Sequence, residues 1–179
     1  MAKRNAPKKN VKKPQKTKPV EDWGGIAIIG GVRRPPPTTW DGVVARLAAS
    51  LADMRGGDFL IVSAKHGNIY VQFAAQGDEM RVEAASNTYL DEGHRLSPAV
   101  RKRMLGYGWH APWVRPKGYT GPPKESPNYH RDFVVPLPHQ KIAECAVETL
   151  RDVYGIQEPA ELQYEGFTKP APTSKTSGN

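Results

Sequence analysis

This sequence has a single cysteine, Cys145, among its 179 residues. One cysteine excludes a disulfide framework within the chain and a zinc site built from several cysteines. No stretch of about 18 apolar residues occurs, so no segment is typical of a membrane-spanning helix. The basic start is not followed by an apolar segment, so we expect no secretory signal. Together these absences favour a soluble, cytoplasmic protein.

The first twenty residues contain no acidic side chain and hold the whole net charge of +8. Their basic residues are Lys3, Arg4, Lys8, Lys9, Lys12, Lys13, Lys16 and Lys18. The other 18 Lys and Arg residues balance the 18 acidic ones, so the basic surface expected of a nucleic-acid-binding fold is missing from the body of the chain. We expect a disordered basic tail that could bind nucleic acid, an acidic partner or an anionic surface.

Motifs for catalysis, metal binding and phosphate binding are also missing. The glycine pairs Gly24-Gly25 and Gly30-Gly31 fit no phosphate-binding pattern, and the sequence has no G-x-S-x-G nucleophile motif. The five histidines lack the spacing, or the cysteine neighbours, of a metal site: His66, His94, His110, His130 and His139. We therefore expect a protein that is not an enzyme and that needs no cofactor or metal.

Composition divides the chain into a basic tail (1–20), an irregular approach segment (21–37), one folded domain (38–167) and a second disordered tail (168–179). The domain begins with a predicted helix that Thr38 or Thr39 caps and that Gly56-Gly57 ends. Its apolar residues recur at helical spacing: Trp40, Val43, Val44, Leu47, Leu51 and Met54.

Three strands are predicted after this helix, over residues 58–64, 69–75 and 80–87. In the second of them, Ile69, Val71 and Phe73 alternate with Tyr70 and Gln72. Period-two alternation and short glycine-containing turns indicate an antiparallel meander with one buried face.

The second half of the domain adds two helices and further strands. Ser97 and Pro98 begin a helix that turns Val100, Met104 and Leu105 inward. A loop rich in Pro and Gly (112–127), a strand (129–135), a helix from Pro138 to Gly155 and an edge strand (160–164) follow. The helix from Pro138 carries the stripe Ile142, Cys145, Ala146, Thr149, Leu150, Val153 and Tyr154. This order predicts an α+β fold: an antiparallel sheet, a three-stranded meander plus one or two further strands, with about three helices packed on it.

Aromatic and basic residues gather between Ser86 and Phe133, around the Pro- and Gly-rich loop. Such residues can stack on bases or anchor peptides. The alternative is that Trp109 and Tyr89 are simply core residues. Trp113 and Tyr119, inside the broken loop, are expected to be accessible.

A set of short motifs runs from about Asn68 to Leu162: Tyr70-Val71-Gln72-Phe73, Glu83-Ala84-Ala85-Ser86-Asn87 with Tyr89-Leu90, Leu96-Ser97, Leu105-Gly106-Tyr107-Gly108-Trp109 with Pro112, Asn128-Tyr129-His130-Arg131-Asp132, and Val153-Tyr154-Gly155. With these motifs the chain resembles the TY-Chap family, bacterial domains similar to type III secretion chaperones. The resemblance implies an α+β chaperone-like fold that binds peptide segments of a partner without catalysis. It leaves a homodimer open.

The leading hypothesis is a non-enzymatic, chaperone-like module that binds a protein or peptide client through an aromatic groove and a sheet edge. The residues expected to bind peptide are Tyr70, Gln72, Asn87, Tyr89, Trp109, Trp113, Asn128 and Arg131. The alternative is a nucleic-acid-associated protein tethered by its Lys-rich N-terminal tail.

Overall fold

The computed structural model describes residues 36–114 and 125–167. The basic tail, most of the approach segment, Tyr119 and the C-terminal tail lie outside the described residues, so the expectations for them stay predictions. Within the described residues, the helices and strands are α1 (Trp40–Asp53), β1 (Phe59–Ala64), β2 (Tyr70–Gln76), β3 (Glu79–Ala84), α2 (Pro98–Gly106), β4 (Tyr129–Val134), α3 (His139–Glu148) and β5 (Leu162–Phe167).

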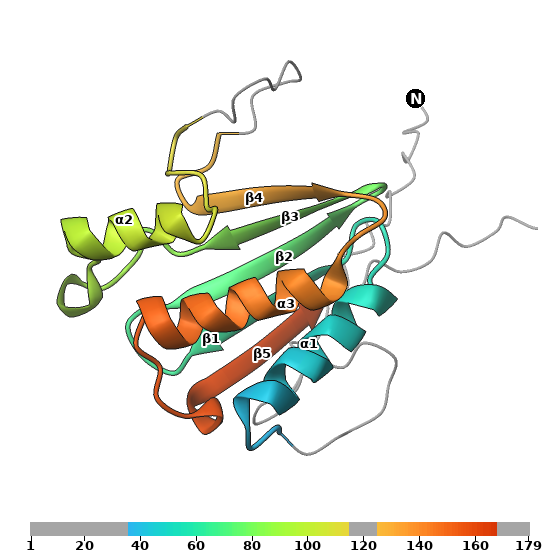
Figure 1. Ribbon diagram of the computed structural model, residues 1–179, viewed down its shortest axis with the longest axis horizontal. Helices are drawn as coiled ribbons and strands as arrows, with labels where there is room; N and C mark the ends of the chain where they lie inside the picture. The colour runs from blue at the N-terminus through green and yellow to red at the C-terminus, as the bar shows by residue number, and fades with distance from the viewer. Residues whose placement is uncertain (1–35, 115–124, 168–179) are drawn as a thin grey trace, which may run out of the picture.

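The strands form one antiparallel sheet of five, in the order β4-β3-β2-β1-β5 (Figure 1). The meander β1-β2-β3 is therefore extended by β4 on one side and by β5 on the other. Phe73 of β2 lies opposite Leu60 of β1 and Val82 of β3, and all three side chains are buried. The α+β prediction, with an antiparallel meander and two further strands, is confirmed.

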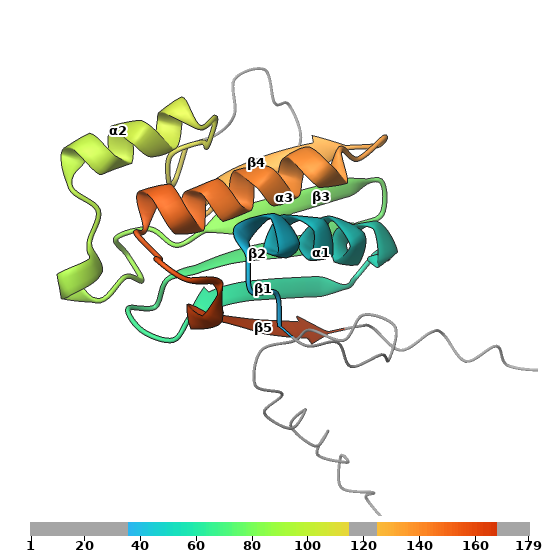
Figure 2. The ribbon, with the colours of Figure 1, turned by 60° about the horizontal axis from the view of Figure 1, so that its bottom comes forward.

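Helices α1 and α3 lie side by side on one face of the sheet (Figure 2). Each presents an apolar stripe to the strands, with Val43, Leu47 and Leu51 on α1 and Ile142 and Ala146 on α3. Burying these side chains between helix and sheet contributes to the hydrophobic stabilisation of the fold. The two helices leave the opposite face of the sheet, which carries the alternate residues of each strand, without a helix in the described structure.

Helix α2 lies apart from α1, at the end of the sheet where β3 ends and β4 begins (Figure 1). Only Met104 of this helix is buried, while Arg103 donates from Nη1 to the carbonyl oxygen of Asp152 at 3.0 Å. Leu105, predicted to face inward, is 50% exposed, so that prediction is wrong. Successive side chains on a helix point about 100° apart. The contact of α2 with the end of α3 therefore buries Met104 but leaves the neighbouring Leu105 exposed.

Helix α3 continues into a π-helical turn over Thr149–Val153 that the sequence pattern did not reveal. The predicted stripe also omitted Ala143 and Val147, which are buried as well. The third predicted strand ends at Ala84 rather than at residue 87, because the chain turns at Ser86. There the Thr88 backbone N–H donates to the Ser86 hydroxyl at 3.1 Å. The predicted edge strand is confirmed, but it begins only after a short 3₁₀ turn, Pro159–Glu161.

The cap of α1 yields a stability prediction, because the sequence left Thr38 and Thr39 as alternatives. The structure selects Thr39, whose hydroxyl accepts from the Gly42 backbone N–H at 3.1 Å. Replacing Thr39 with alanine is expected to lower the free energy of unfolding by about 1 kcal/mol, measured by urea denaturation. Thr38→Ala is the matched control and should change it by less than about 0.5 kcal/mol. Equal losses in the two variants would contradict the assignment.

Candidate functional site

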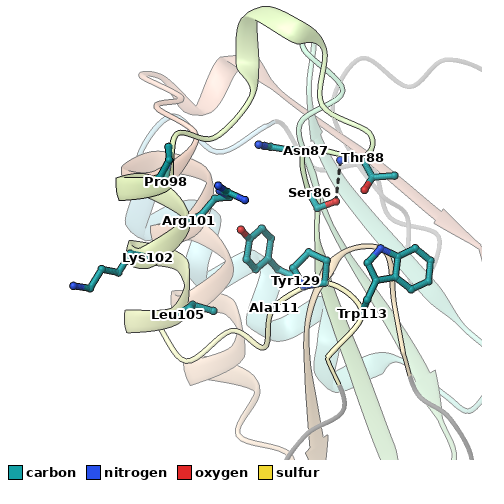
Figure 3. Close-up of a pocket in the computed structure, with 11 residues that line it drawn as sticks. Ser86, Asn87, Thr88, Pro98, Arg101, Lys102, Leu105, Ala111, Trp113 and Tyr129 are labelled. Carbon is teal, nitrogen blue, oxygen red and sulfur yellow. Dashed lines mark hydrogen bonds between the residues drawn. The ribbon is translucent and has the colours of Figure 1, made fainter.

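A cavity of about 510 Å³ opens between α2, the turn after β3 and the start of β4 (Figure 3). We name it the α2 pocket. Its lining residues are Ser86, Asn87, Thr88, Pro98, Arg101, Lys102, Leu105, Ala111, Pro112, Trp113 and Tyr129. Four separate stretches of the chain meet there, so its shape depends on the tertiary fold.

Side-chain hydrogen bonds fix the turn that leads from β3 to α2. The Ser86 hydroxyl donates to the carbonyl oxygen of Pro127 at 2.5 Å, which ties this turn to the start of β4. Asn87 closes the following loop, since its Nδ2 donates to the carbonyl oxygen of Leu96 at 2.9 Å and its Oδ1 accepts from the Leu96 N–H at 2.7 Å. Ser97 then caps α2 by accepting from the Val100 N–H. Asn87, one of the predicted site residues, thus holds the pocket in shape.

Trp113 lies across the pocket from α2, and its side chain is 64% exposed. The Trp113 backbone has φ +62°, a region that non-glycine residues rarely adopt, and its N–H donates to the carbonyl oxygen of Ser126 at 2.7 Å. Leu105 at the pocket and Val114 next to Trp113 are also about half exposed, at 50% and 49%. Large apolar side chains grouped in solvent around a cavity are typical of a recognition surface.

The charged side chains of the α2 pocket are all basic. Arg101 and Lys102 come from α2, and the described lining residues include no Asp or Glu. Figure 3 shows the hydroxyl of Tyr129 on the same side of the cavity as Arg101. Burial raises the pKa of the Tyr129 hydroxyl, although the nearby Arg101 acts in the opposite direction. The tyrosine therefore stays protonated at neutral pH and can donate a hydrogen bond.

Two other predicted site residues, Trp109 and Arg131, do not line the pocket. Trp109 is only 2% exposed, and its indole N–H donates to the Thr149 hydroxyl at 3.0 Å. Arg131 donates from Nη1 to the carbonyl oxygen of Tyr107 and to the sulfur of Cys145, each at 3.1 Å. Burial raises the pKa of the Cys145 thiol, with Arg131 opposing that effect. Trp109 thus links the segment after α2 to the π-helical turn after α3, and Arg131 links β4 to α3. Trp109 is a core residue, which is the alternative that the sequence left open.

Tyr70, Gln72 and Asn128 belong to another place, the face of the sheet opposite the helices. The Asn128 amide nitrogen donates to the Tyr70 hydroxyl at 3.0 Å and to Glu83 Oε2 at 3.3 Å. The Gln72 amide donates to the same carboxylate oxygen at 2.7 Å. Asn128 is 4% exposed, and burial raises the pKa of Tyr70. These three predicted residues are thus engaged with one another and with Glu83.

A second cavity, of about 600 Å³, lies on this opposite face, around the turn between β1 and β2. Tyr70 and Gln72 line it, together with Asn68, which donates to Asp91 Oδ1 at 2.6 Å. Its lining includes none of the large apolar residues that the described structure exposes. We therefore place the candidate site at the α2 pocket.

The eight predicted residues thus do not form one surface. Asn87 and Trp113 line the α2 pocket, whereas Trp109 and Arg131 make contacts inside the domain. Tyr70, Gln72 and Asn128 lie on the opposite face of the sheet, and Tyr89 is 46% exposed. Their assignment to peptide binding stays a prediction. The α2 residues that line the pocket were not among the predicted site residues. A signal for them was present, since Pro98, Arg101, Lys102 and Leu105 have the i, i+3, i+4, i+7 spacing of one helical face.

The buried His130 of β4 predicts how the stability of the domain depends on pH. Its side chain is 0% exposed, its ring packs against His110 with centroids 5.4 Å apart, and its Nε2 has no hydrogen-bond partner among the described residues. Burial lowers the pKa of the imidazole below its usual value of 6.5. On acidification the unfolded chain binds a proton there before the folded protein does, so the free energy of unfolding should fall below about pH 7.

The measurement is urea denaturation at several values between about pH 7.5 and pH 5. His130→Gln should show a weaker dependence on pH than the wild type, because it removes this difference in proton binding. His66, which is exposed, supplies the matched control His66→Gln. An unchanged pH dependence in His130→Gln would show that the imidazole is not held neutral.

A membrane-spanning helix and a metal-binding cluster are both absent from residues 36–114 and 125–167. No helix there is long and apolar enough to cross a membrane. Within the same ranges, no group of three or more His, Cys, Asp or Glu side chains is placed to hold a metal ion.

Comparison with known proteins identifies the family. No curated protein and no solved structure matches the chain. Residues 34–168, well over half of the chain, match TY-Chap3, described as "T3SS (YopN, CesT) and YbjN peptide-binding chaperone 3". The match spans every described helix and strand and includes the whole α2 pocket. The chain therefore belongs to the TY-Chap3 family of peptide-binding chaperones.

Proposed function

We propose that this protein binds a peptide segment of a client protein in the α2 pocket, without catalysing a reaction. The observation that carries the proposal is the position of Trp113 and Leu105, two large apolar side chains on opposite sides of the cavity. Trp113 is 64% exposed and Leu105 is 50% exposed. A client side chain placed between them would remove both from water. Aromatic side chains in such positions contribute most of the binding free energy of protein interfaces.

The backbone at Trp113 supports the same proposal. A non-glycine residue at positive φ costs of order 1 kcal/mol, and the surroundings must hold it there. The hydrogen bond from the Trp113 N–H to Ser126 does so. The indole is turned into solvent and is not part of the core, so folding stability gives no reason for the strained backbone. A role of the indole in binding does give one.

The predicted contact of a client with a sheet edge would have to be made at a different place from the α2 pocket. The outer side of β4 is partly occupied, since His110 and His130 exchange two backbone hydrogen bonds, at 2.9 and 3.2 Å. At the other edge, β5 has one strand neighbour, β1, among the described residues. The two edges lie roughly 19 Å apart across five strands. We propose that a client reaches β5 only through a second, longer segment, and that the α2 pocket is the main site.

A displayed library of random peptides tests the proposal. The full chain and its Leu105→Ser/Trp113→Ser double variant are each used to select peptides of about ten residues. Peptides enriched by the wild type but not by the double variant would support the α2 pocket. If the two proteins enrich the same peptides, or neither enriches any, the proposed site is wrong. Repeating the selection with a chain that begins at Glu21 separates any contribution of the basic tail.

A further inference from the structure

Among the arginines that the structure describes near the pocket, Arg101 stands out because its guanidinium has no hydrogen-bond or ion-pair partner in the described residues. Arg81, in contrast, forms a two-point contact with Asp132, at 2.9 and 3.1 Å. Arg103 and Arg131 donate to backbone carbonyl oxygens. An arginine that lines a cavity and lacks a partner there is available to a ligand.

We propose that the α2 pocket selects client segments in which a carboxylate lies next to an apolar side chain, with Arg101 as the partner of that carboxylate. The inference rests on the proposed peptide-binding function and adds the chemistry of the client. Charge complementarity supports this preference. The pocket offers cations and no described acid, whereas the chain after residue 20 is formally neutral as a whole.

The geometry favours Arg101 over its neighbour Lys102. In Figure 3 the guanidinium of Arg101 lies at the cavity, near the hydroxyl of Tyr129, while the ammonium of Lys102 points away from it. A guanidinium presents parallel N–H groups that match the two oxygens of a carboxylate, which an ammonium cannot do. The protonated Tyr129 hydroxyl adds a further donor on the same side.

The apolar part of the preference follows from the next turn of α2. Leu105 is four residues after Arg101, so the two side chains share one face of the helix. Trp113 faces them across the cavity. A client segment whose carboxylate reaches Arg101 would place a neighbouring side chain between Leu105 and Trp113. A lysine or arginine in place of the acid would meet like charge.

The probes are the displayed random peptides and then synthetic copies of the best enriched one, with their binding to the full chain measured by fluorescence anisotropy. We expect Asp or Glu beside an aliphatic or aromatic residue in the enriched sequences. Changing that acid to its amide should weaken binding roughly ten-fold, as should Arg101→Gln. The two changes together should cost little more than either alone, because they remove the same contact.

Charge-matched variants on the same helix are the controls. Lys102→Gln should weaken binding much less than Arg101→Gln, and Arg103→Gln, outside the pocket, should leave it unchanged. Copies with a free or an amidated C-terminus tell an acidic side chain from a terminal carboxylate, and preference for either agrees with the proposal. Enriched peptides without any carboxylate dependence, or an amide effect that persists in Arg101→Gln, would overturn it. In those outcomes peptide binding itself would still stand, whereas absence of enrichment would overturn the proposed function.

Discussion

Replacing Trp109 with alanine is expected to lower the free energy of unfolding by about 3–5 kcal/mol, the largest effect of the substitutions considered. The side chain is 2% exposed and packs among the core residues between α2 and α3. Truncation would leave a cavity that the surrounding strands and helices cannot fully close. It would also remove the indole N–H that donates to the Thr149 hydroxyl. That hydroxyl would keep only its own hydrogen bond to the carbonyl oxygen of Cys145, at 2.7 Å.

Urea denaturation measures this loss, with Trp109→Phe as a second variant that keeps most of the apolar volume. The phenylalanine variant should lose only about 1–3 kcal/mol, the cost of the missing hydrogen bond and of a smaller ring. It should stay folded, so its peptide affinity can be measured and should be close to that of the wild type. If Trp109→Phe kept its stability but lost peptide binding, Trp109 would be a contact residue rather than a supporting one.

Trp113→Ala is expected to have the opposite profile. We expect peptide affinity to fall roughly thirty-fold, which corresponds to about 2 kcal/mol, because the exposed indole supplies much of the apolar contact in the pocket. The free energy of unfolding should change by less than about 0.5 kcal/mol, since a side chain that is 64% exposed contributes little to the core. Fluorescence anisotropy with the enriched peptide and urea denaturation measure the two quantities.

Val134 supplies the matched control for this prediction. Its side chain is 62% exposed, it lies at the far end of β4, and it does not line the α2 pocket. Val134→Ala should change neither affinity nor stability appreciably. Equal losses of affinity in the two variants would mean that binding depends on general surface hydrophobicity, and a loss of stability in Trp113→Ala would place Trp113 in the core.

Local patterns were enough to predict most of the fold. The cap and apolar stripe of α1, the alternation in β2 and the Ser97-Pro98 start of α2 each depend on residues within one or two turns of chain. The π-helical turn and the exposure of Leu105 depend instead on how α2 meets the end of α3. That contact joins segments about fifty residues apart, which periodicity within either helix does not describe.

The site was harder to predict than the fold. Trp109 and Trp113 are close in sequence and identical in type, yet one is buried and the other is 64% exposed. The difference depends on Thr149 for the first and on Ser126 for the second, neither of which is a neighbour in sequence. Motif resemblance selected Tyr70 and Asn128, which stabilise the opposite face of the sheet. Arg101 was not selected, because none of the motifs includes residues 98–104.

The hydrogen bond between the Trp113 N–H and the Ser126 carbonyl also has a consequence for how this domain can vary. It brings together the two points where residues 115–124 leave and rejoin the described structure. The pocket-forming residues all lie outside that interval. A change in the number of residues between 115 and 124 would therefore leave the contact between Trp113 and Ser126, and with it the walls of the α2 pocket, in place.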